Sequence, residues 1–219
     1  MSASRTHIDE YPQAGRAGAR AALTALTFLL ALPACTARTP EVREGDLIFQ
    51  TSKSTQSLAI QQATHSRYSH MGVILNHNGQ PTVFEATATV RYTPLRDWIA
   101  RGNHSAYVLK RLRSPLSAAQ IATLHTIAQS FEGKPYDLTF EWSDERIYCS
   151  ELVWKLYDQA LHIRLGERQR LGDFDLSGAA VRAKMLERYH GRVPLDEPVI
   201  SPAAMFDSTL LTTVSSASP

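Results

Sequence analysis

Residues 70–86, HMGVILNHNGQPTVFEA, decide the fold because they predict a β-hairpin centred on Asn78 and Gly79. Asn-Gly is the strongest short signal for a two-residue hairpin turn, since both turn positions need positive φ. With these two residues in the turn, His77 faces Gln80. The sequence therefore predicts two antiparallel strands with a defined register.

This register places His70 and Glu85 on the same face of the hairpin. Ile74 then faces Val83 and Gly72 faces Glu85, and side chains alternate between faces along each strand. The Cα atoms of His70 and Glu85 become diagonal neighbours about 7–8 Å apart, close enough for the carboxylate to reach the imidazole. Two alternatives stay open: an accidental surface pair, and a one-residue slip that puts the two side chains on opposite faces.

The rest of the chain alternates short strands with helices. Ser117 and Gln120 have the form of a capping box, and apolar residues recur behind them at helical spacing until Gly133. No repeat or internal linker interrupts the chain, so we predict one α+β domain. The expected strands are 47–49 and 107–112, and the expected helices are 57–64, 117–132, 149–160 and the more polar stretch 161–190.

Composition and charge exclude several classes of protein. The chain has 219 residues, of which 43% are hydrophobic and 20% charged, so it is neither wholly disordered nor a many-span membrane protein. The formal net charge of +2 gives no reason to expect nucleic-acid binding. The two cysteines and eight histidines show no ligand spacing, and we expect no metal and no other cofactor.

The N-terminal segment has the pattern of a processing signal. Arg16 and Arg20 precede the apolar run 21–32, which ends in Leu32-Pro-Ala-Cys35 and resembles a bacterial lipobox. We therefore predict a signal peptide over 1–35, lipidation of Cys35, a tether over 36–44 and a location in the cell envelope, anchored to the outer membrane. Ordinary cleavage after an alanine and an uncleaved anchor are the alternatives. The predicted domain covers 45–205, followed by a C-terminal tail over 206–219.

Cys149 stands where an apolar helix begins, after Ile147 and Tyr148. Unpaired backbone N–H groups and the helix dipole favour a thiolate at this position, and the same N–H groups can form an oxyanion hole. A thiolate nucleophile needs a base, which His70 supplies, and Glu85 can hold the imidazole in one tautomer. The alternative is that Cys149 is a small buried hydrophobic residue.

Three motifs carry a resemblance to a known family. They are Tyr68-Ser-His-Met-Gly-Val-Ile74, Val83-Phe-Glu-Ala86 and Glu141-Trp-Ser-Asp-Glu-Arg-Ile-Tyr-Cys-Ser-Glu-Leu-Val153. Together they resemble the circularly permuted NlpC-type papain-like cysteine peptidases and amidases, the YiiX/YebB-like group, in which histidine precedes cysteine. The resemblance implies a small antiparallel sheet or partial barrel packed against helices. It also implies Cys149 as nucleophile, His70 as base and Glu85 as the orienting residue. Apart from the resemblance, Tyr148 and Ser150 flank the nucleophile and are candidates for shaping the substrate site, and Asp46 and Tyr68 are candidates for lining it. The alternative for Asp46 and Tyr68 is a role in the core or in a turn.

The resemblance implies an amide hydrolase that acts through an acyl-thioester. An envelope location makes cell-wall peptides or related peptides the expected substrate. Two alternatives remain: a lipid acyltransferase or thioesterase of the lecithin:retinol acyltransferase type, and a non-catalytic lipoprotein that binds a peptide or amino acid. The expected partners are the substrate and the membrane, the latter through the lipid on Cys35.

Overall fold

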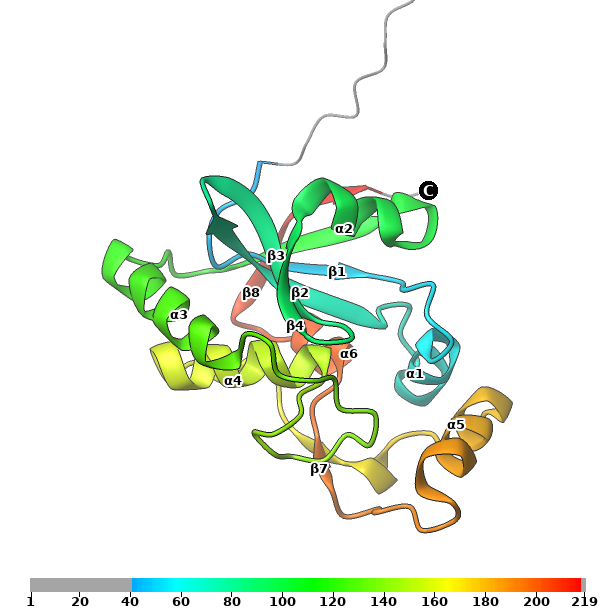
Figure 1. The fold of residues 1–219 in the computed structure, drawn as a ribbon. Coiled ribbons are helices and arrows are strands. Elements are labelled where there is room, and N and C mark those ends of the chain that lie inside the picture. Colours follow the sequence, from blue (N-terminus) through cyan, green and yellow to red (C-terminus); the bar gives the residue numbers. More distant parts are fainter. Residues whose placement is uncertain (1–40, 218–219) are drawn as a thin grey trace, which may run out of the picture. The chain divides into compact units, whose positions relative to one another are not determined.

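A computed structural model describes residues 41–217, which contain a six-stranded antiparallel sheet with helices on both faces (Figure 1). The sheet has the order β4-β3-β2-β1-β5-β8 and is open. Its strands are β1 (Leu47–Gln50), β2 (His70–His77), β3 (Gln80–Ala86), β4 (Val90–Pro94), β5 (Tyr107–Leu112) and β8 (Leu211–Ala217).

The helices occupy the remaining segments. The α-helices are α1 (Ser57–Thr64), α2 (Leu95–Arg101), α3 (Ala118–Phe131), α4 (Cys149–Leu161), α5 (Ala179–Tyr189) and α6 (Pro202–Phe206). Two short 3₁₀ turns lie at Asn103–Ser105 and Leu171–Asp173, and β6 (Gln169–Arg170) pairs with β7 (Pro198–Val199). No helix among residues 41–217 has the length and apolarity needed to cross a bilayer.

The predicted hairpin is confirmed. His77 pairs with Gln80 and Ile74 pairs with Val83, while Asn78 and Gly79 both have positive φ, at 52° and 75°. These angles suit a two-residue turn whose twist matches that of the flanking strands. The register therefore follows from the turn and fixes which side chains of β2 and β3 share a face.

Alternation along the strands divides the apolar core between the two faces of the sheet. Leu47 and Phe49 belong to the larger cluster, which includes α3 and α4, whereas Ile48 points to a smaller cluster with Trp98 of α2. Helix α4 is buried at each of its first nine positions, 149–157. A helix with so little exposed surface is held in a fixed position by packing on all sides.

The capping box and helix predicted behind Ser117 are confirmed. The Ser117 side chain accepts a hydrogen bond from the Gln120 N–H, and the Gln120 side chain accepts one from the Ser117 N–H. Leu124, Ala128 and Phe131 are the buried residues of α3. The helical spacing of apolar residues thus correctly identified both the helix and its inward face.

Two sequence predictions are wrong. Residues 161–190 are not one helical stretch, because α4 ends at Leu161, His162 adopts a left-handed conformation, and helix resumes only in α5. The predicted tail 206–219 is not a tail over its described part, because β8 (Leu211–Ala217) pairs with β5 along its length and completes one edge of the sheet. Strand β8 is rich in Ser and Thr, and its pairing comes from the free edge of β5 rather than from an apolar pattern of its own.

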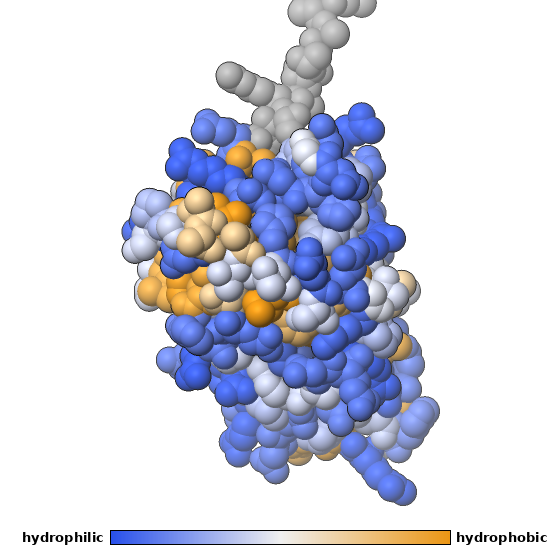
Figure 2. All heavy atoms as spheres, turned by 60° about the vertical axis from the view of Figure 1, so that its left-hand side comes forward, coloured by the Kyte–Doolittle hydropathy of each residue, from blue (hydrophilic) through white to orange (hydrophobic). Residues whose placement is uncertain are grey.

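Figure 2 shows one face of the molecule coloured by hydropathy. This face is largely hydrophilic, with apolar side chains gathered in one area. The large apolar side chains that are exposed among the described residues are Leu58, Leu138, Leu186, Leu195, Leu210 and Val214. The features that distinguish this molecule lie inside, around the N-terminus of α4.

Candidate active site

Cys149 is the first residue of α4, as predicted, and is only 3% exposed. Tyr148 precedes the helix in an extended conformation and its hydroxyl accepts a hydrogen bond from the Ile200 N–H at 3.0 Å. The Ser150 hydroxyl donates to the Ile200 carbonyl at 2.8 Å. Both neighbours of the cysteine therefore hold the same buried segment, and this fixes the thiol in position.

His70 and Glu85 form a direct contact across the hairpin. The Nε2 atom of His70 lies 2.6 Å from Oε2 of Glu85, and both side chains are buried. The Trp98 ring stacks against the imidazole with the ring centroids 5.9 Å apart. The predicted diagonal pair on one face of the hairpin is therefore present.

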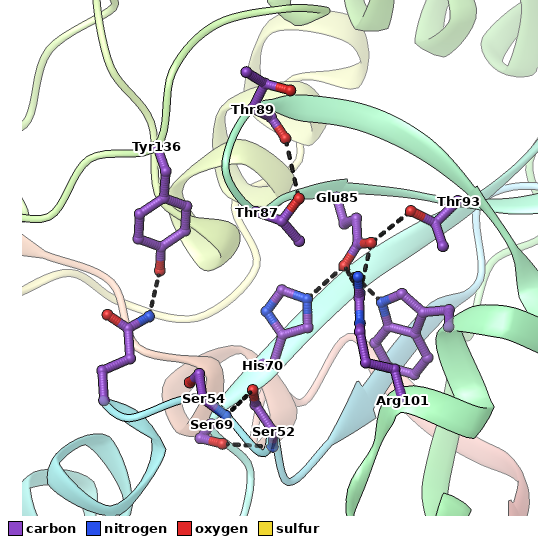
Figure 3. Close-up of polar contacts among 12 residues, drawn as sticks. Ser52, Ser54, Ser69, His70, Glu85, Thr87, Thr89, Thr93, Arg101 and Tyr136 are labelled. Atoms are coloured by element: carbon purple, nitrogen blue, oxygen red, sulfur yellow. Dashed lines mark hydrogen bonds and ion pairs between the residues drawn. The ribbon is translucent and has the colours of Figure 1, made fainter.

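Glu85 accepts hydrogen bonds from three further side chains (Figure 3). Thr93 donates to Oε1 at 2.6 Å, Trp98 donates to Oε2 at 2.9 Å, and Arg101 lies 2.6 Å from both oxygens. Burial raises the pKa of Glu85, but its hydrogen bonds and charge interactions, chiefly those with His70 and then Arg101, outweigh burial and lower the pKa to about 2. Glu85 is therefore ionised at neutral pH.

The electrostatic environment of His70 favours its charged form. Burial lowers the pKa of the imidazole, but hydrogen bonds and charge interactions with Cys149 and Glu85 outweigh burial and raise the pKa to about 9. Because Glu85 occupies Nε2, the ring nitrogen available to Cys149 is Nδ1. Sulfur, imidazole and carboxylate thus converge, although they come from α4, β2 and β3.

Two pockets meet at these residues. One borders Cys149 but not His70, and its wall is mostly apolar. The other borders His70 but not Cys149, and most of the side chains that line it are polar or charged. The apolar pocket is lined in part by Ala59, Ile60, Ala63, Leu171, Phe174, Leu176, Val181, Met185, Val199 and Pro202. The polar groove is lined in part by Ser52, Lys53, Ser54, Thr55, Thr87, Arg101, Lys184, Glu187 and Arg188.

Tyr136 lines both pockets, and the sequence analysis did not identify it. Burial, with a smaller contribution from Cys149, raises the pKa of its phenol far above the usual value, so the hydroxyl keeps its proton. The Gln56 side-chain N–H donates to the phenol oxygen at 2.8 Å. The phenol proton is therefore available to a second acceptor, such as an oxygen atom of the substrate.

The four predicted substrate contacts divide into two groups. Tyr148 and Ser150 line the apolar pocket. Asp46 lines neither pocket and instead forms a buried ion pair with Arg111, with N–O distances of 2.6 and 2.8 Å. Tyr68 also lines neither pocket and stacks on Phe206 with the ring centroids 4.1 Å apart. Asp46 and Tyr68 therefore lie outside both pockets, where Asp46 forms an ion pair and Tyr68 packs against another ring.

Thr93, Trp98 and Arg101 were also missed by the sequence analysis. They come from β4 and α2, two elements that the sequence analysis did not predict. Trp98 and Arg101 are three residues apart on a helix, and this spacing places them on one face. The signal that could have identified them is the spacing of Trp98 and Arg101, an aromatic and a cationic residue on one helix face shortly before the predicted strand 107–112.

Comparison with known proteins identifies the family. Residues 41–215 match the family described as permuted papain-like amidase enzymes, YaeF/YiiX, C92. The chain belongs to this family. Its resemblance to permuted papain-like cysteine amidases is thus confirmed, with the family given as the YaeF/YiiX enzymes rather than the NlpC type. As a member of this amidase family, the chain is a cysteine hydrolase with the permuted papain-like fold.

Two relatives from Escherichia coli are similar over most of their length. The uncharacterised protein YiiX of strain K12 is 50% identical over 192 residues, which cover 88% of this chain and 94% of YiiX. A crystal structure of YiiX from O157:H7, described as a metalloprotein, has a TM-score of 0.79 and 52% identity, and the match covers 81% of this chain and 98% of that one. Within residues 41–217, no group of three His, Cys, Asp or Glu side chains is placed to hold a metal ion.

Proposed function

We propose that this amidase hydrolyses its substrate through a Cys149–His70–Glu85 triad and an acyl-thioester intermediate. The observation that carries the proposal is the convergence of the three side chains. Glu85 contacts one nitrogen of the imidazole at 2.6 Å, and Cys149 lies close enough to the imidazole to raise its pKa. A buried, ionised carboxylate behind the imidazole stabilises the imidazolium that forms with the thiolate.

In the first half of the reaction, Sγ of Cys149 attacks the carbonyl carbon and forms a C–S bond while the carbonyl π electrons move to oxygen. The N–H groups at the start of α4 and the Tyr136 hydroxyl are the donors available to that oxyanion. His70 gives its proton to the leaving nitrogen, the C–N bond breaks, and the amine departs. Cys149 is then a thioester.

In the second half, His70 takes a proton from water and the resulting hydroxide attacks the thioester carbon. The C–S bond breaks, the carboxylic acid is released, and the thiolate–imidazolium pair is restored. Glu85 remains ionised throughout, since its pKa is about 2. No added oxidant or cofactor enters either half of this scheme.

The apolar pocket favours an aliphatic acyl group in the substrate. It borders the nucleophile, and its wall is built mainly from the side chains of α1, α5 and the segments 171–176 and 199–202. An alkyl chain gains about 0.8 kcal/mol per buried CH₂ in such a pocket, whereas a polar peptide has to lose its hydration there. The pocket thus supports the lipid-acyl alternative over cell-wall peptides. The positions of His70 and Glu85 support a catalytic protein over a binding module.

A direct comparison of substrates tests this function. N-dodecanoyl amides and soluble muropeptides are incubated with the protein, and amine release is measured for the wild type, Cys149→Ala and His70→Gln. Both variants are expected to lose turnover, and denaturing mass spectrometry of the wild type is expected to show one acyl group on Cys149. Cys35→Ala, the other cysteine variant, is the matched control. Full turnover by Cys149→Ala contradicts the mechanism, and exclusive cleavage of muropeptides contradicts the acyl preference.

We also propose a cell-envelope location, with a lipid on Cys35, which lies outside the described residues. The proposal is supported by the Leu32–Cys35 motif that follows an apolar run. In cells fed an alkyne-tagged fatty acid, the wild-type protein is expected to carry the tag and Cys35→Ala to lose it. Equal labelling of the two proteins contradicts the anchor.

A further inference from the structure

We infer that the polar groove beside His70 binds an anionic group, a carboxylate or a phosphate, carried by the amine that leaves. The inference rests on the proposed function and extends it to the second half of the substrate. The substrate class that fits both pockets is an N-acyl amine with an aliphatic acyl chain and an acidic leaving amine. Four observations lead to this conclusion.

The first observation is the position of the groove relative to the catalytic pair. His70 must hand its proton to the leaving nitrogen, so the leaving amine lies on the His70 side of the scissile bond. The polar groove borders His70 but not Cys149, and the apolar pocket borders Cys149 but not His70. Gln56, Tyr136, Lys184 and Arg188 border both, and the scissile carbonyl has to lie where the two pockets meet. The polar groove is therefore the leaving-group side.

The second observation is the charge of the groove wall. Its wall includes four cationic side chains and one carboxylate, that of Glu187, which pairs with Lys184 at 2.6 Å. Arg101 is paired with the buried Glu85. In the part of the chain that the structure describes, Lys53 and Arg188 have no carboxylate within ion-pair distance. The groove thus has an excess of positive charge, although the chain as a whole is nearly neutral.

The third observation is the placement of Arg188. Its Nη2 donates to the Gln56 side-chain oxygen, and its guanidinium lies 5.0 Å from the centroid of the Phe140 ring. Its Nε is buried and has no hydrogen-bond acceptor within residues 41–217. A buried donor without a partner costs free energy, and carboxylate and phosphate oxygens are the partners that guanidinium groups bind best. Arg188 is thus held in place while its Nε donor remains without a partner among the described residues.

The fourth observation is the supply of neutral donors around the same groove. Ser52, Ser54 and Thr55 line it from the loop before α1, and Thr87 lines it from the end of β3. Figure 3 shows Ser52 and Ser54 on the same side of the imidazole as Ser69. Hydroxyl and guanidinium groups together bind the oxygens of carboxylates and phosphates, whereas the unpaired cations repel an ammonium group.

The experiment compares matched substrates that differ only in the charge of the leaving amine. N-dodecanoylglycine is compared with N-dodecanoylglycinamide, and N-dodecanoyl-phosphoethanolamine with N-dodecanoylethanolamine. The wild type is expected to prefer the anionic member of at least one pair by about 10-fold in kcat/KM, mainly through KM. The two pairs distinguish a carboxylate from a phosphate ligand.

Variants then test which side chain produces the preference for the anionic substrate. Lys53→Gln is expected to lower the ratio of anionic to neutral kcat/KM by about 3-fold, because one exposed charge contributes modestly. Arg96→Gln, an exposed change on α2 outside the groove, is the matched control and is expected to leave the ratio unchanged. Raising NaCl from about 0.05 M to about 0.5 M is expected to reduce the ratio in the wild type.

Two results overturn the inference while the amidase proposal survives: equal turnover within both pairs, or faster turnover of both neutral members. If no amide is turned over, the proposed function fails instead. Calorimetric binding of N-dodecanoylglycine and N-dodecanoylglycinamide to the intact protein then still decides the anion site. Tighter binding of the carboxylate that weakens in Lys53→Gln supports the site, and equal Kd values overturn it.

Discussion

Replacing Glu85 by Gln removes one negative charge from the interior and keeps the size of the side chain. In the wild type this carboxylate is fully buried and accepts hydrogen bonds from four side chains, two of which, His70 and Arg101, carry positive charge. A Gln amide offers one oxygen and turns an NH₂ group towards the remaining donors. We therefore expect a loss of both stability and activity.

The pKa of Glu85 gives the magnitude of the stability loss. The difference between the ordinary value of 4.5 and about 2 corresponds to about 3 kcal/mol, at about 1.4 kcal/mol per pKa unit. Because the folded-state pKa is the lower one, this stabilisation is complete above the unfolded-state pKa and is lost as pH falls through the folded-state pKa. It should still be about 2 kcal/mol at about pH 3.5.

The assay is urea unfolding of the wild type and Glu85→Gln, followed by circular dichroism at about pH 7 and about pH 3.5. The free energy of unfolding of the variant should be lower by about 3 kcal/mol at the higher pH and by about 2 kcal/mol at the lower. Glu145→Gln, at an exposed position, is the control and should change stability by less than about 0.5 kcal/mol. A difference of less than about 1 kcal/mol at about pH 7 would refute the reasoning.

Three further predictions follow from other contacts. Amidase activity should fall as pH rises above about 9, because His70 then loses the proton that it gives to the leaving amine. A pH profile of kcat/KM checks this prediction. Activity that is unchanged to about pH 11 contradicts it. Gly72→Ala should destabilise the fold by about 1–3 kcal/mol, since its Cβ would lie 2.4 Å from a Val83 methyl group; an unchanged Tm would contradict this. Lys155→Met should lower the free energy of unfolding by about 3 kcal/mol, because it leaves the buried Glu151 unpaired. Urea unfolding of the double variant with Glu151→Gln should show that most of this stability is restored.

Much of the sheet and three of the helices, α1, α3 and α4, could be predicted from local sequence. The hairpin register follows from Asn78 and Gly79, and the start of α3 follows from Ser117 and Gln120. The errors concern segments whose structure depends on distant partners. Strand β8 forms because β5 presents a free edge, and residues 162–178 contain β6 and a 3₁₀ turn and bury Leu165 and Leu171 in the core instead of continuing α4.

The candidate triad could be predicted from the sequence, because each member has a local signal. Cys149 begins a helix, and the hairpin turn places His70 and Glu85 on one face. The surroundings of the triad carried no such signal. Arg101 reaches Glu85 only through α2, and Tyr136 reaches the site from a segment without regular structure.

The sequence by itself determined the hairpin register and the helix start at Cys149, because each is encoded by residues within a few positions of one another, and three such short motifs together identified the family. Only the tertiary structure decided that Arg101 ion-pairs with Glu85, that Asp46 and Tyr68 lie outside both pockets, and that the apolar pocket and the polar groove meet at the candidate catalytic pair. The physical reason is that pocket walls combine side chains from α1, α5 and loops far apart in the chain. Their contacts are set by packing rather than by local propensity.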